Sequence, residues 1–147
     1  MHFRVGQLVG VQRVLHLVWL KHPKESLCDD RLSYMLDVLG LRDPWMHRVD
    51  LARATGRPLT LGAHDQLIVA QVIADLGRTW EERPVLLELT GPAGGRWTLG
   101  LGTHLATVRA DPVDYMRTLS GREHHPTLEA DRNQVAVAAV TAARVVF

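Results

Sequence analysis

Cysteine and lysine are almost absent from this chain. Cys28 is the only cysteine among 147 residues, so no internal disulfide can form and no cage of thiolates can hold a metal. Lys21 and Lys24 are the only lysines, and the formal net charge of +1 gives no electrostatic reason to expect a nucleic acid or a membrane surface as a partner. No apolar run is long enough to span a bilayer. These absences favour a protein of the reducing cytoplasm.

What the chain does contain is typical of a globular protein. Hydrophobic residues make up 46% of it and charged residues 22%, which argues against a disordered chain and is enough for one real core. The segment 57–62, with a proline near its start and a glycine at its end, is the candidate boundary between two domains. We expect a helical piece over residues 1–57 and a small domain over residues 63–147. The predicted fold class is α+β.

Three helices are predicted before this boundary. Residues 5–20 form the first, because apolar residues recur there at helical spacing: Leu8, Val11, Leu15 and Val18. The second covers residues 30–40, with Gly40 as a candidate terminator, and the third covers residues 43–56. The sequence leaves open whether these last two are separate helices or one helix kinked at Pro44.

The pattern changes after residue 62. A helix is predicted over residues 63–80, and the alternation that follows predicts three strands, at residues 85–90, 96–100 and 104–110. The glycine-rich segment 91–95 lacks the Lys-Ser/Thr of a phosphate loop and predicts a hairpin turn. Asp111 followed by Pro112 predicts the start of a helix over residues 112–121, and residues 131–134 resemble a capping box ahead of a second helix over residues 135–143, although the valines there leave a strand possible. A docked apolar tail follows. We therefore expect an antiparallel β-meander packed on helices.

The chemically suggestive stretch runs from residue 42 to residue 57. In a helix, Asp43, His47 and Asp50 would share one face, and a carboxylate one turn from an imidazole can bind a single metal ion. Asp50 would either orient His47 without touching the metal itself or face water. Asp43 followed by Pro44 is equally typical of a helix start, in which the aspartate accepts from free N–H groups. Both interpretations stay open.

Nearby charged residues have similar alternatives. Arg48 and Arg53 flank the motif and could hold the carboxylate of a substrate, although arginines at such positions commonly face solvent. His64 and Asp65 stand at the start of the helix predicted over residues 63–80. There Asp65 suits the positive end of the helix dipole, and His64 is expected at the surface.

Two parts of the chain resemble a known family. Residues 32–38 and the stretch 42–57 (Arg-Asp-Pro-Trp-Met-His-Arg-Val-Asp-Leu-Ala-Arg-Ala-Thr-Gly-Arg) resemble the last bundle helix of the mycothiol-dependent maleylpyruvate isomerase family. Residues 86–91 and 116–122 resemble that family's smaller domain. The family joins a DinB-like four-helix metal-binding bundle to a domain resembling sterol carrier proteins. The resemblance covers about residues 31 to 147 and lacks the early bundle helices.

The resemblance implies a metal and a cofactor. Asp43 and His47 would bind a divalent metal, zinc in most members, and the family's third ligand is a histidine on an early helix, for which His16 is the nearest candidate here. Mycothiol would supply a thiol whose pKa the metal lowers. The thiolate would add to the cis double bond of an unsaturated or electrophilic acid, rotation would follow, and elimination would give the trans product. One alternative keeps the metal but carries out another thiol transfer, since DinB-like bundles also serve such reactions. The other is a non-enzymatic paralogue or truncated product that binds a small hydrophobic ligand or a partner.

The missing helices predict an apolar surface. Residues 1–57 supply at most three helices, so Trp19, Met35, Leu39 and Trp45 should lie partly exposed. Two chains paired about a two-fold axis could bury these side chains. Such a homodimer could also bring His16 of one chain toward the metal-binding residues of the other.

Overall fold

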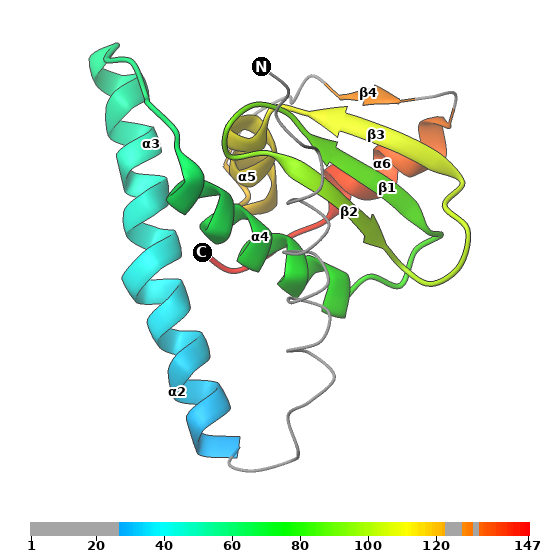
Figure 1. Cartoon of the computed structure of the whole chain (residues 1–147), viewed down its shortest axis with the longest axis horizontal. Coiled ribbons are helices and arrows are strands. Elements are labelled where there is room, and N and C mark those ends of the chain that lie inside the picture. Colours follow the sequence, from blue (N-terminus) through cyan, green and yellow to red (C-terminus); the bar gives the residue numbers. More distant parts are fainter. Residues whose placement is uncertain (1–26, 123–127, 131–132) are drawn as a thin grey trace, which may run out of the picture. The chain divides into compact units, whose positions relative to one another are not determined.

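The computed structural model describes residues 27–122, 128–130 and 133–147 (Figure 1). Contacts divide the chain into two compact units, residues 1–34 and residues 35–147. The helix predicted over residues 5–20, with His16 and Trp19, lies outside the described residues. The sheet and the motif stretch both belong to the second unit. The division into evolutionary domains at residues 58–62 stays a prediction.

The described chain is a mixture of helices and strands. The helical elements are α2 (Leu27–Asp37), the wide turn η2 (Val38–Arg42), α3 (Asp43–Thr55), α4 (Ala63–Arg78), α5 (Pro112–Leu119) and α6 (Gln134–Ala142). The strands are β1 (Val85–Leu89), β2 (Gly95–Leu99), β3 (Ala106–Ala110) and the short β4 (Glu129–Ala130). The predicted α+β class is confirmed at this level, and all three predicted strands are present. The strand β4 was not predicted.

One continuous helical run contains the motif stretch. Residues 35–55 are helical without a break, so Gly40 does not end a helix, contrary to the sequence-based expectation. The turn η2 explains how Pro44 is tolerated inside this run. Asp43 donates its N–H to the carbonyl of Val38, five residues back, and this widened turn makes room for a proline, which has no N–H and crowds the preceding turn. Asp43 therefore lies within a helix and does not act as its N-cap.

The sheet is mixed, with strand order β2-β1-β3-β4, and the predicted antiparallel meander is wrong. Strands β1 and β2 form the expected antiparallel hairpin, but β3 pairs with β1 in parallel, with Val85 opposite Ala106. The loop after β2 causes this. Gly100, at a φ of 82°, passes close to Pro84, and Leu105 then donates its N–H to the carbonyl of Pro84 at 2.9 Å. The chain thereby crosses the start of β1 and emerges on its far side.

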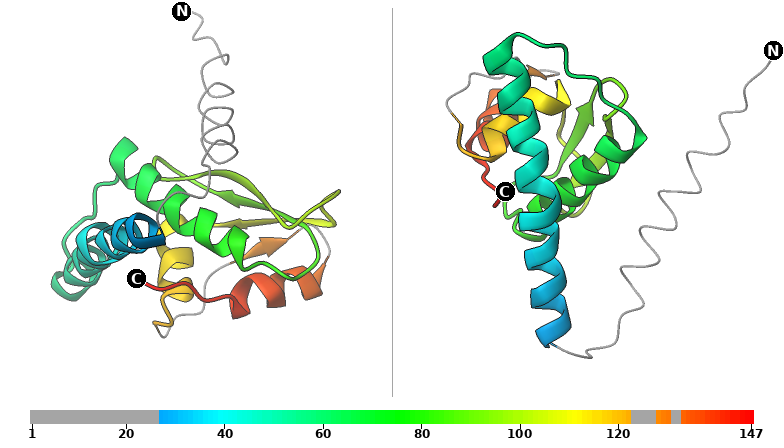
Figure 2. Two further views of the ribbon diagram at one scale, coloured as in Figure 1. Left: turned by 90° about the horizontal axis from the view of Figure 1, so that it is seen from below. Right: turned by 90° about the vertical axis from the view of Figure 1, so that its left-hand side faces the viewer.

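The core lies on one face of this sheet. Alternate residues of β1 and β3 are buried there, and they pack with apolar side chains of α4, α5 and α6 in a single cluster. Figure 1 shows α5 and α6 passing behind the strands, and the left panel of Figure 2 shows them on the same side. The opposite face carries a row of charges in which Glu88 bridges Arg96 at 2.6 Å and Arg109 at 2.5 Å. This second face is therefore solvated.

The two C-terminal helices and the apolar tail are present as predicted. Asp111 caps α5 by accepting from the N–H groups of Val113 and Asp114, and Asn133 caps α6 in the same way. The C-terminal tail is docked, because Val145 donates its N–H to the carbonyl of Leu119 at 3.0 Å. These contacts fix the end of the chain against the core.

Candidate functional site

Asp43 and His47 lie on one face of α3, as predicted. The Nε2 atom of His47 is 3.4 Å from Oδ1 of Asp43, and both side chains are open to solvent, with 63% and 43% of their surface exposed. Their oxygen and nitrogen donors are of the kinds that zinc prefers, and an open position beside them could accept a third ligand. Among the described residues, no group of three His, Cys, Asp or Glu side chains could hold a metal. The pair supplies two side chains of the kinds that bind zinc, and ligation stays a prediction.

Asp50, which was predicted to share a face of α3 with Asp43 and His47, forms ion pairs with two arginines at and just after the end of α5. Its carboxylate accepts from Nη1 of Arg117 at 3.2 Å, and from Nε and Nη2 of Arg122 at 2.9 and 2.8 Å. No contact between Asp50 and His47 is seen in the described structure. The position of Asp50 is explained by these two arginines, which fasten α3 to the end of α5. Its predicted bracing of His47 has no support from this geometry.

The inward side of α3 carries a polar centre that the sequence did not reveal. The carboxylate of Asp65 is wholly buried, and it accepts from Nε1 of Trp45 at 2.7 Å, from the guanidinium of Arg48 and from the N–H of Gly62 at 2.6 Å. Trp45 is only 4% exposed, so the prediction that it lies at the surface is wrong. Arg48 is occupied by this contact, which makes it a poor candidate for holding a substrate.

Burial alone would raise the pKa of Asp65, but its partners reverse the effect. The hydrogen bond from the N–H of Gly62, the side-chain hydrogen bonds from Trp45 and Arg48 and the positive charge of Arg48 together hold the pKa of Asp65 below its usual value. The carboxylate is therefore ionised throughout the physiological range. His64, exposed as predicted, has its Nε2 3.3 Å from the same carboxylate. Asp65 ties α3, the 57–62 segment and α4 together.

A second buried charge anchors the wide turn. Arg42 is 1% exposed, and its Nη1 lies 2.7 Å from Oδ2 of Asp75 on α4 and 3.4 Å from the carbonyl oxygen of Val146. One arginine thus joins the helical run, α4 and the C-terminal tail. Arg42 and Asp65 together show that the inward side of the run is locked in place by charge-assisted contacts.

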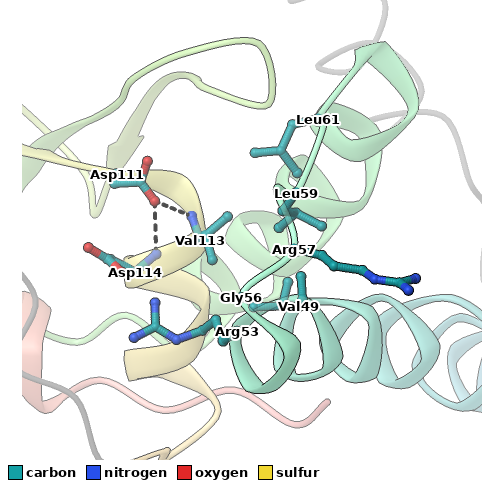
Figure 3. A pocket seen from close by; sticks show the side chains of 10 residues that line it. Val49, Arg53, Gly56, Arg57, Leu59, Leu61, Asp111, Val113 and Asp114 are labelled. Atoms are coloured by element: carbon teal, nitrogen blue, oxygen red, sulfur yellow. Dashed lines mark hydrogen bonds between the residues drawn. The ribbon is translucent and has the colours of Figure 1, made fainter.

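A surface cavity of about 520 Å³ lies between the end of α3, the segment 57–61 and the start of α5 (Figure 3). Its apolar lining comes chiefly from four side chains: Val49, Leu59, Leu61 and Val113. Figure 3 shows the guanidinium of Arg53 on the α5 side of the cavity, whereas Arg57 extends away from it. No ion pair or hydrogen bond joins the side chain of Arg53 to another described residue. The cavity could accept a small apolar group with a negatively charged end.

The three comparisons with known proteins add nothing to this geometry: no family model, no curated protein and no solved structure matches the chain. In the described part of the chain, none of the helices has both the length and the hydropathy needed to cross a bilayer.

Proposed function

We propose that this protein carries out metal-assisted thiol chemistry of the maleylpyruvate isomerase type, with mycothiol as the thiol. One observation carries the proposal: Asp43 and His47 present an oxygen and a nitrogen donor on the same exposed helix face, 3.4 Å apart. The assignment of the helical run to a DinB-like bundle, and of residues 63–147 to a sterol-carrier-like domain, belongs to the same proposal. So does the cytoplasmic location.

Each residue would have a distinct role in this reaction. Asp43 and His47 would hold a divalent metal, most simply zinc, which lowers the pKa of a thiol placed beside it. Arg53 lies about 120° around the helix from His47 and lines the cavity on the α5 side, so it would hold the carboxylate of a ligand in that cavity and not of one at the metal. The mycothiol sulfur would form a bond to one alkene carbon, and the former double bond would rotate. Loss of the same thiolate would then restore the double bond in the trans form.

Metal content and activity test this proposal together. The purified chain should bind zinc in equilibrium dialysis, and His47→Ala should lose at least tenfold in zinc affinity, because one of the ligands is gone. His104→Ala, which removes an exposed histidine far along the sequence, is the matched control and should bind zinc as the unaltered chain does. Mycothiol-dependent isomerisation of a cis-unsaturated dicarboxylic acid should follow the zinc content. Zinc binding that is unchanged by His47→Ala would rule out the site.

The cavity favours a second candidate, a binding module for a small hydrophobic ligand. Leu61 and Val113 form part of its apolar lining, and such a module would need no metal. A fluorescent fatty acid analogue should then bind the zinc-free chain, and Leu61→Gln should weaken that binding several-fold. Binding that Leu61→Gln leaves unchanged would place the ligand elsewhere. Zinc dependence separates the two candidates, because only the catalyst requires the metal.

A further inference from the structure

The outward side of the helical run combines apolar and metal-binding side chains in one line. Met35, Leu39, Asp43, His47 and Leu51 follow each other at intervals of four residues; Asp43 is half-buried and the other four are exposed. Leu39 precedes the polar pair and Leu51 follows it, and 62% and 65% of their surfaces are exposed, which are large fractions for leucines. We call these five residues the outward stripe.

The wide turn reduces the winding of the outward stripe at one of its four steps. In an α-helix, a step of four residues overshoots a full turn by about 40°, so a line at this spacing would gradually wind around the helix. The turn η2 contains more residues per turn, which offsets the overshoot between Leu39 and Asp43. The opposite side of the run confirms the orientation, because Val38, Met46 and Val49 are buried against the core. The outward stripe therefore faces away from the second unit's own core.

The polar pair within the outward stripe is incomplete as a metal site. A zinc ion in a protein has three or four protein ligands, whereas Asp43 and His47 supply two. No third His, Cys, Asp or Glu joins them among the described residues. A second copy of the same surface would supply two more, and the apolar residues beside the pair would be buried in the same step.

We propose that two copies of this chain pack their outward stripes against each other about a two-fold axis and share one metal ion between them. This inference rests on the metal site of the proposed function. The spacing of the stripe fits an antiparallel arrangement centred between Asp43 and His47. Asp43 would then lie opposite His47 of the partner subunit, and Leu39 would lie opposite Leu51 of the partner subunit. Two carboxylates and two imidazoles would surround the ion, and a thiol would enter as a fifth ligand or by displacing a carboxylate.

The size of the outward stripe makes this association depend on the metal. Seventeen helical residues extend about 25 Å, and one such helix pair buries less than the roughly 800 Å² per partner of a standard interface. The leucines alone would give weak association. The metal ion, held by both chains at once, would supply the rest, so we expect a dimer with zinc and a monomer without it.

Sedimentation velocity with metal analysis of the same samples tests the proposal, using the full chain with zinc chloride or with EDTA. We expect a dimer that contains one zinc per two chains, and a monomer in EDTA. Leu51→Gln should weaken association at least tenfold, because a buried leucine is lost from both partners while the ligands stay. Leu67→Gln is the matched control, since Leu67 on α4 is also 65% exposed and lies off the outward stripe. It should dimerise normally.

Each other outcome is decisive. A monomer with one zinc per chain would overturn the shared site and would leave the proposed function standing. A chain that binds no zinc would overturn both. A dimer that persists in EDTA, or that Leu51→Gln does not weaken, would show that association uses another surface.

Discussion

The inward and outward sides of the helical run differ in whether their side chains have partners within the second unit. On the inward side, Trp45 and Arg48 both donate to a buried carboxylate, and Met46 has no exposed surface. On the outward side, His47 and Leu51 are mostly exposed, although they belong to the same helix. The comparison teaches that folding of the second unit depends on one side only. The other side is free to serve binding, and substitutions should separate the two roles.

The largest effect should come from the buried carboxylate on the inward side. Asp65→Asn removes the charge that balances Arg48 and replaces one acceptor oxygen by an amide NH2 that points at other donors. We expect a loss of about 3–5 kcal/mol in the free energy of unfolding, measured by urea denaturation. Asp43→Asn, the same chemical change on the outward side, should cost no more than about 0.5 kcal/mol. Equal losses in the two variants would contradict the comparison.

The same carboxylate should make stability depend on pH. The pKa of Asp65 is lowered by folding, so the unfolded chain takes up the proton first as the pH falls. The ionised Asp65 therefore contributes fully to the free energy of unfolding well above about pH 4, the ordinary pKa of an aspartate. This contribution is lost as the pH falls through the lower pKa that Asp65 has in the folded chain. Urea midpoints of the unaltered chain and of Asp65→Asn should converge over that acid range. A constant difference down to pH 2 would show that the charge is not responsible.

A slightly smaller effect is expected for apolar truncation on the inward side. Met46→Ala would leave a cavity in a fully buried position and should cost about 2–5 kcal/mol. Leu51→Ala, five residues further along the same helix, should cost less than about 0.5 kcal/mol in the zinc-free monomer. The two urea midpoints therefore measure the difference between the sides directly. A large loss for Leu51→Ala without zinc would mean that the outward side is packed within the monomer.

The sequence predicted the elements better than their connections. The caps at Asp111 and Asn133 and the hairpin turn after β1 follow from local chemistry, which short windows of sequence contain. The partner of β3 was missed because alternation shows that a segment is a strand but does not show which strand lies beside it. Gly40 was interpreted as a helix end, and Pro44 as a helix start or a kink. The widened turn η2 allows both residues to lie within one helical run, and local propensity does not predict such a turn.

The candidate site was predictable only on its outward side. Asp43 and His47 share a face because their spacing requires it in any helix. Asp65 looked like an ordinary residue at a helix N-terminus, and nothing in the sequence shows that Trp45 and Arg48 would reach it. Such contacts join residues about 20 positions apart, and they depend on how the 57–62 segment folds back. Periodicity carries no information of that kind.

The smallest predicted effect tests whether the outward side is open at the wide turn. Gly40 lies in the wide turn η2 without a positive φ, and a Cβ built on it meets no atom within 4 Å. Gly40→Ala should therefore stabilise the monomer by about 0.5–1 kcal/mol, because alanine loses less conformational freedom on folding. Gly56 also meets no atom within 4 Å, but its φ is 65°.

Gly56→Ala is thus a control in equally open space, at the left-handed C-cap of α3, and it should destabilise by about 1 kcal/mol because a side chain is strained in the left-handed region. Thermal unfolding in EDTA measures both variants, and the two shifts in Tm should have opposite signs. If Gly40→Ala instead lowered Tm in the zinc-free monomer, the added methyl group would have to meet a packed surface. The outward side would then be covered within one chain, and the comparison between the two sides of the helix would fail at this turn.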